Sequence, residues 1–128
     1  MVILDTSYLF SLFQEEDDFH QKALGLSEKL DDEVSYITFL VFQELLTLIT
    51  SRFSSAEAIR VADILNSERS PVQFLKLDEE YFDDTLALFK KLSPHRFSFV
   101  DVSLMVLAKN MEARVLTFDE RLDRACQV

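Results

Sequence analysis

The order of apolar and polar positions along the chain predicts short strands separated by helices. Apolar or β-branched runs of strand length lie at 2–4, 34–38, 72–77 and 115–118. Between them, helical spacing or long apolar segments predict helices at about 17–30, 39–53, 54–66, 78–91, 98–110 and 119–125. Strands that alternate with helices form parallel sheets covered on both faces. We therefore expect an α/β fold with three layers (α/β/α) and a short parallel sheet flanked by helices.

Several helix boundaries carry local signals. Ser54 followed by Glu57 has the spacing of a capping box. Pro71 and Pro94 interrupt the chain between predicted elements. The segment 39–53 is apolar nearly all round, so we expect a buried helix there.

The composition fits one globular domain. The 128 residues, 48% of them hydrophobic, suit a single domain over 1–128 that buries its own core. Cys126 is the single cysteine and cannot form an internal disulfide. Gly25 is the single glycine, which excludes P-loops and dinucleotide-binding fingerprints. Neither a secretory leader nor a run of about 18 apolar residues is visible, so we expect a cytoplasmic protein without a membrane span.

Four acidic residues stand out because their sequence neighbours are apolar. Asp5 and Asp119 end predicted strands, whereas Glu44 and Asp101 lie in early turns of predicted helices. Ligands of parallel sheets bind beyond the carboxyl ends of the strands, so all four can project toward one edge. Carboxylates crowded in apolar surroundings repel one another unless they bind a cation. Carboxylate oxygens suit Mg²⁺ or Mn²⁺, ions that support phosphodiester hydrolysis by water.

Three of these acids also have a structural interpretation. Asp5 and Asp119 could each cap the helix that follows. Asp101 lies three residues after Ser98 and could complete a capping box. Glu44 lies too far into its helix to cap it, and its helical neighbours do not form a plainly polar face.

The other charged residues are interpreted as surface. Acidic runs at 15–18, 31–33 and 78–80 lie in loops or first turns, and His20 and His95 lack the spacing of metal ligands. The 23 Asp and Glu exceed the 13 Lys and Arg, which gives a net charge of −10. This acidity argues against a broad electrostatic surface for nucleic acid.

Five short motifs surround the four acids in chain order. They are Val2–Leu9 (VILDTSYL), Phe19–Leu24 (FHQKAL), Phe42–Leu46 (FQELL), Phe97–Asp101 (FSFVD) with Ala108, and Val115–Asp119 (VLTFD). This ordered set covers nearly the whole chain and resembles the PIN domain, especially the VapC-type toxins of toxin–antitoxin pairs.

The resemblance implies an endoribonuclease that depends on Mg²⁺ or Mn²⁺. It implies that Asp5, Glu44, Asp101 and Asp119 are the catalytic, metal-binding acids. A hydroxyl of Thr6 or Ser7 would support the site. It also implies an RNA substrate, a homodimer and, for a toxin, an antitoxin partner.

In so acidic a protein, positive RNA contacts must be few and local. We nominate three arginines in loops or at helix ends near the expected site: Arg52, Arg96 and Arg121.

Three other interpretations compete. A haloacid-dehalogenase-type phosphatase needs a second Asp where this chain has Ser7. A response-regulator receiver needs paired acids at the first strand and a late Lys, but Asp5 is alone and no Lys follows Lys109. A non-catalytic PIN-like interaction module would explain the net charge of −10, but it would not explain why Glu44 stands in an apolar helix. Such a module predicts no stabilisation by Mn²⁺.

Overall fold

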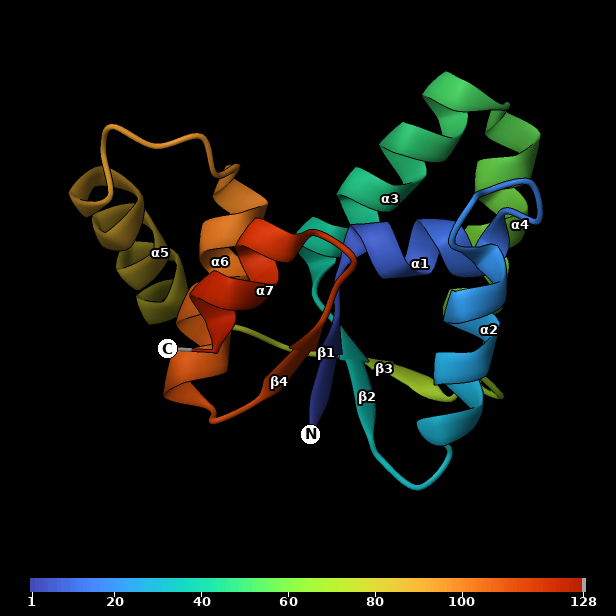
Figure 1. The fold of residues 1–128 in the computed structure, drawn as a ribbon, viewed down its shortest axis with the longest axis horizontal. Helices are drawn as coiled ribbons and strands as arrows, with labels where there is room; N and C mark the ends of the chain where they lie inside the picture. Colours follow the sequence, from blue (N-terminus) through green and yellow to red (C-terminus); the bar gives the residue numbers. More distant parts are fainter. Residues whose placement is uncertain (128) are drawn as a thin grey trace.

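Four parallel strands form the centre of the molecule (Figure 1). The computed structural model describes residues 1–127, which form four strands and seven helices. The strands are β1 (Val2–Leu4), β2 (Ser35–Ile37), β3 (Val72–Phe74) and β4 (Arg114–Leu116). The helices are α1 (Thr6–Phe13), α2 (His20–Lys29), α3 (Phe39–Arg52), α4 (Ser55–Leu65), α5 (Glu79–Lys91), α6 (Phe99–Asn110) and α7 (Glu120–Cys126).

The sheet has the order β3-β2-β1-β4, and every pairing is parallel. In the centre, Ile3 of β1 lies opposite Tyr36 of β2 and Val115 of β4. The chain moves in one direction from β1 to β3 and then returns across the sheet to β4. Because parallel crossovers are right-handed, this reversal places α1–α4 on one face and α5–α7 on the other, as Figure 1 shows. The three-layer α/β/α expectation is confirmed.

Helices on both faces explain why β1 is apolar throughout. All three of its residues are at most 2% exposed. Leu9 and Leu45 from the first helical layer and Leu104 and Leu122 from the second belong to the same core. No helix within residues 1–127 is long and apolar enough to cross a membrane.

Two expectations for the helices were incomplete or wrong. Helix α1 was not predicted from the sequence. It carries no charged residue and buries five of its eight positions. The expected burial of 39–53 on all sides is wrong, because α3 buries only Val41, Leu45 and Ile49. Phe39 is 71% exposed. These buried residues are four apart and form one stripe, whereas Phe42, Leu46 and Leu48 beside it are only partly buried against the core.

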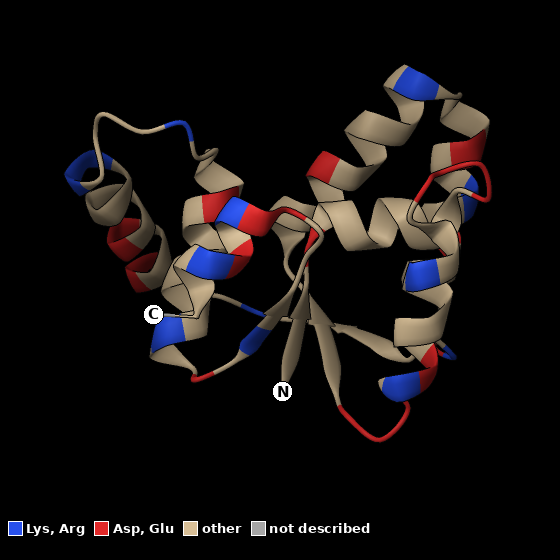
Figure 2. Cartoon of the chain, viewed as in Figure 1, with Lys and Arg blue, Asp and Glu red and all other residues tan. Residues whose placement is uncertain are grey.

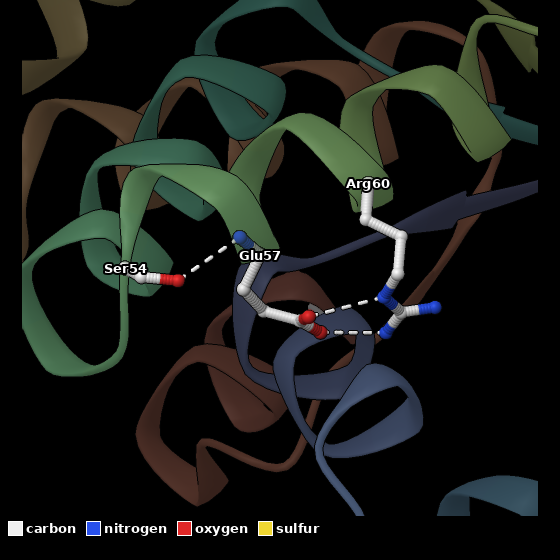
Figure 3. A network of polar contacts seen from close by, with 3 residues as sticks. All are labelled: Ser54, Glu57 and Arg60. Carbon is white, nitrogen blue, oxygen red and sulfur yellow. Dashed lines mark hydrogen bonds and ion pairs between the residues drawn. The ribbon is translucent and has the colours of Figure 1, made fainter.

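The capping box expected at α4 is half formed (Figure 3). Ser54 Oγ accepts from the Glu57 backbone N–H at 3.1 Å, as expected. The Glu57 carboxylate does not return to Ser54 but pairs with Arg60, whose Nε donates to Oε2 at 3.0 Å. An exposed ion pair of this kind adds at most about 1 kcal/mol, so Ser54 is the stronger determinant of where α4 begins.

Candidate active site

The four acids lie around the carboxyl ends of the strands. Asp5 directly follows β1, and Asp119 follows the neighbouring parallel strand β4. Glu44 lies in the second turn of α3, and Asp101 in the first turn of α6. Figure 2 shows acidic positions gathered where these helices meet the end of β1. The placement expected from strand ends and early helical turns is therefore present.

Asp5 is held by side-chain hydroxyls. Its Oδ2 accepts from Ser7 Oγ at 2.9 Å and from Thr117 Oγ1 at 2.7 Å. The residue is 4% exposed and occupies the N-cap position of α1, yet its side chain makes no capping hydrogen bond. The capping interpretation of Asp5 is therefore wrong.

Ser7 and Thr117 join the ends of β1 and β4. Ser7 Oγ accepts from the Phe118 backbone N–H at 2.9 Å, and Thr117 Oγ1 accepts from the Asp119 N–H at 3.0 Å. Each hydroxyl has one proton to donate, and each donates it to Asp5. Ser7 was an expected supporting residue, whereas Thr117 was missed. Its signal in the sequence was a polar residue at the end of an apolar strand, two positions before Asp119.

Glu44 is a half-buried carboxyl that pairs with no Lys or Arg among residues 1–127. Burial raises its pKa above the ordinary value of 4.5, the Thr6 hydroxyl opposes this, and the negative charges of Asp5 and Asp101 raise it further. Thr6 is buried, and its Oγ1 makes no well-formed hydrogen bond within residues 1–127. The Thr6 hydroxyl is thus available to a further group beside Glu44.

Glu44 and Thr6 line a groove of about 520 Å³ between α3 and the start of α6. Gln43, Thr47 and Ser51 supply its other polar groups. Leu40, Leu48 and Val100 make the remaining wall apolar. Glu44 therefore faces a cavity large enough for a small ligand or part of a chain.

Asp101 caps α6, as one of its two interpretations predicted. Its Oδ2 accepts from the Ser98 N–H at 3.1 Å while Ser98 Oγ accepts from the Asp101 N–H at 3.0 Å, which completes a capping box. Burial raises the pKa of Asp101 above 3.8, the bonds to Ser98 lower it, and Asp5 and Asp119 raise it. Asp101 therefore caps α6, and the negative charges of Asp5 and Asp119 also raise its pKa.

Asp119 caps the last helix. Its Oδ1 accepts from the backbone N–H groups of Arg121 at 2.9 Å and Leu122 at 3.2 Å. Its second carboxyl oxygen makes no hydrogen bond to residues 1–127. The capping interpretation is thus correct for Asp119, and one oxygen remains available.

The histidines and the cysteine do not join this site. The imidazoles of His20 and His95 each contact a backbone carbonyl at 2.8 Å, those of Ser11 and Phe89. Burial raises the pKa of Cys126 to about 12, and nearby carboxylates add to this, so its thiol stays protonated and is a poor nucleophile.

The profile of one protein family, described as PIN domain, matches residues 2–128. The chain belongs to the PIN domain family. This confirms the resemblance seen in the motifs. A comparison with curated protein sequences gave no significant match.

Several solved structures share the whole fold at low sequence identity. One is Mycobacterium tuberculosis VapC20, described as a sarcin–ricin-loop-cleaving toxin, with a TM-score of 0.86, 20% identity, and coverage of 98% of this chain and 95% of that one. Another is FitAcB from Neisseria gonorrhoeae, with a TM-score of 0.71, 16% identity, and coverage of 100% and 94%. A third, FitAB bound to a DNA fragment, has a TM-score of 0.70, 15% identity, and coverage of 100% and 92%.

The acids of this PIN domain surround the strand ends without forming a compact cluster. Within residues 1–127, no three His, Cys, Asp or Glu side chains come close enough to ligate one ion directly. Mg²⁺ commonly keeps several water ligands and uses only one or two carboxylates of the protein. Glu44 and the carboxylate oxygens of the neighbouring acids therefore fit a hydrated Mg²⁺ or Mn²⁺.

Two of the three nominated arginines lie over aromatic rings. The Arg52 guanidinium lies 5.3 Å from the ring centroid of Phe10, and that of Arg121 lies 4.5 Å from Phe97. Arg96 is exposed in the loop before α6. Within residues 1–127, none of the three forms an ion pair with an acid.

Proposed function

We propose that this PIN domain is a metal-dependent endoribonuclease. The observation that supports it best is Glu44: a half-buried carboxyl in a groove that pairs with no Lys or Arg among residues 1–127, and whose pKa is raised by burial and by Asp5 and Asp101. A structural carboxyl would be paired or solvated. This one fits a role in binding Mg²⁺ or Mn²⁺.

The chain's residues would divide the work of hydrolysis. Glu44, Asp5, Asp101 and Asp119 would bind the ion or its water ligands, with Ser7 and Thr117 fixing the orientation of Asp5. The ion supplies Lewis-acid chemistry that favours attack by water on a phosphodiester. Thr6, whose hydroxyl lowers the pKa of Glu44, would help to keep that carboxyl charged. No Ser, Cys or His nucleophile is required.

Cleavage of mixed single-stranded RNAs tests this proposal. Wild type should produce fragments with Mg²⁺ or Mn²⁺ and none with EDTA, and Glu44→Gln should be inactive. Glu57→Gln is the matched control, because Glu57 is also a helical Glu but is ion-paired on the surface, where Arg60 lowers its pKa. Equal cleavage by Glu44→Gln and wild type would refute the assignment. A non-catalytic interaction module would show neither cleavage nor stabilisation by Mn²⁺.

We also propose that Arg52, Arg96 and Arg121 contact RNA phosphates. Each lost contact to single-stranded RNA should flatten the salt dependence of log K by about 0.7. The triple Ala variant should therefore bind more weakly, with a slope flatter by about 2. A matched triple variant at Arg60, Arg69 and Lys91 removes the same charge at exposed positions outside the proposed site, Arg60 being ion-paired with Glu57. Equal affinities for both triple variants would remove the nomination.

A toxin role with a protein partner is proposed from the likeness to VapC20 and the Fit complexes. An antitoxin would inhibit by inserting an Arg among the acids, since a guanidinium pairs well with carboxylates. We further propose a homodimer, because Phe39 and Phe82 are 71% and 53% exposed along one apolar groove between α3 and α5. Sedimentation as a monomer at all concentrations would contradict the dimer.

A further inference from the structure

Two aromatic rings and a lysine form a cluster beside the acids. The Phe19 ring stacks on Phe118, with centroids 5.3 Å apart and an interplanar angle of 26°. Lys22 Nζ lies 5.4 Å from the Phe118 centroid. Phe19 is 49% exposed, although it lies at the N-cap of α2 in an acidic loop. We call Phe19, Lys22 and Phe118 the aromatic platform.

The platform adjoins the acidic site through the chain itself. Phe118 lies between Thr117, which donates to Asp5, and Asp119, which caps α7. The Phe118 N–H donates to Ser7 Oγ at 2.9 Å, and Ser7 also donates to Asp5. The backbone of the platform is therefore fixed by the same hydroxyl that orients Asp5.

The platform also borders a cavity of about 500 Å³. Lys22 and Phe118 line it together with the edge strand β4, and Leu26 and Cys126 close it on the α2 and α7 sides. A cavity of this size can enclose a nucleotide-sized group. An aromatic ring, a cation and a cavity thus meet at one position.

The cavity carries charges of both signs, Lys22 and Arg114 on one hand and Glu112 and Asp123 on the other. Lys22 forms no ion pair with any acid among residues 1–127, although the chain has a net charge of −10. On α7, just beyond Asp119, Arg121 lies over Phe97 as a second pair of cation and ring. Stacking rings with interspersed cations are how proteins hold single-stranded nucleic acid, the rings taking bases and the cations phosphates.

We propose that the aromatic platform binds an unpaired nucleobase of the RNA, stacked on Phe19, while Lys22 contacts the adjoining phosphate. This rests on the proposed nuclease function and assigns the side chains that would hold the nucleotide beside the scissile phosphate. A base inside a duplex cannot stack on a protein ring, so fully paired RNA is a poor substrate.

The test uses RNA oligonucleotides with 2-aminopurine placed in turn at each position beside the cleavage point. Binding is measured in the Glu44→Gln protein, which should not cleave the RNA, and cleavage is measured in wild type with Mn²⁺. At one position the fluorophore should be quenched by stacking, and an abasic nucleotide there should weaken binding about tenfold.

Substitutions at Phe19 separate stacking from packing. Phe19→Tyr should keep the quenching, whereas Phe19→Leu, which preserves apolar volume, should lose it and lower kcat/KM about tenfold. Ile59→Ala is the control, because Ile59 is a similarly exposed apolar side chain on α4 and lies outside the groove proposed for the homodimer. RNA cleavage by wild type with no quenched position, or with equal quenching in Phe19→Leu, would overturn the platform and leave the nuclease. Absence of any RNA cleavage would overturn both.

Discussion

Replacing Thr117 with valine removes one hydroxyl and keeps the shape of the side chain. That hydroxyl donates to Asp5 Oδ2 at 2.7 Å across the β1–β4 pair. Asp5 is 4% exposed, so water cannot easily replace the lost donor. The Asp119 N–H also loses its acceptor, but Asp119 is exposed and water can serve there. The cost should therefore come mainly from Asp5.

The magnitude follows from the charge on the acceptor. A hydrogen bond to a charged group contributes about 1.5–3 kcal/mol, and Thr117 is partly exposed, so about 1.5–2 kcal/mol is expected. For a chain of this length, that corresponds to a fall in Tm of about 6–8 °C. Thermal melts in EDTA measure it. RNA cleavage should also be lost, because Asp5 then keeps only the Ser7 donor.

Two variants control the measurement. Thr117→Ser keeps the hydroxyl and should restore most of the stability and activity. Thr85→Val removes a fully buried hydroxyl that donates to the neutral Tyr81 carbonyl at 2.8 Å, which should cost about 1 kcal/mol and leave cleavage unchanged. The reasoning fails if Thr117→Val costs no more than Thr85→Val, or if Thr117→Ser is equally damaging.

Three further predictions concern the acids. Because the pKa of Glu44 is raised in the folded protein, metal-free wild type should gain stability as the pH falls through that raised value toward 4.5. Glu44→Gln should therefore be more stable than wild type at pH 7. Thermal melts at pH 7 and pH 4.5 should show that the difference in stability between the two proteins shrinks at the lower pH. Asp101→Asn keeps an acceptor for the Ser98 N–H but loses the charge, so in EDTA its free energy of unfolding should be higher than that of wild type by about 1 kcal/mol. Ser98→Ala should lower the free energy of unfolding by a similar amount. A lower stability of Asp101→Asn would mean that the capping role of Asp101 dominates its charge. Mn²⁺ at a hundred times its dissociation constant should stabilise wild type by about 2.7 kcal/mol, and an equal gain in Glu44→Gln would exclude Glu44 as a ligand.

The sequence predicted the positions of the acids because they depend on local features. Asp5 ends an apolar run, and Asp119 follows another. Once strands and helices alternate, parallel order brings both to one edge of the sheet. Glu44 was recognisable because it interrupts an apolar helix without a capping role.

The contacts of the site could not be predicted, because they depend on which strands become neighbours. Thr117 reaches Asp5 across 112 residues of sequence, and β4 could have paired at another position in the sheet. Helix α1 was missed because a segment without charges has no polar stripe to show its period. For Asp101 the sequence offered capping and electrostatic strain as alternatives, and the structure contains both.

The way the four acids are held would let them keep their negative charge for the proposed cation. Two of them, Asp101 and Asp119, accept from backbone N–H groups at helix N-termini, where the helix dipole favours negative charge. Asp5 accepts from two hydroxyls. Within residues 1–127, no Lys or Arg pairs with any of the four. A basic partner would neutralise a carboxylate and would have to be displaced by an incoming ion. Neutral donors fix the carboxylates and leave their negative charge in place, so attraction for a cation is retained.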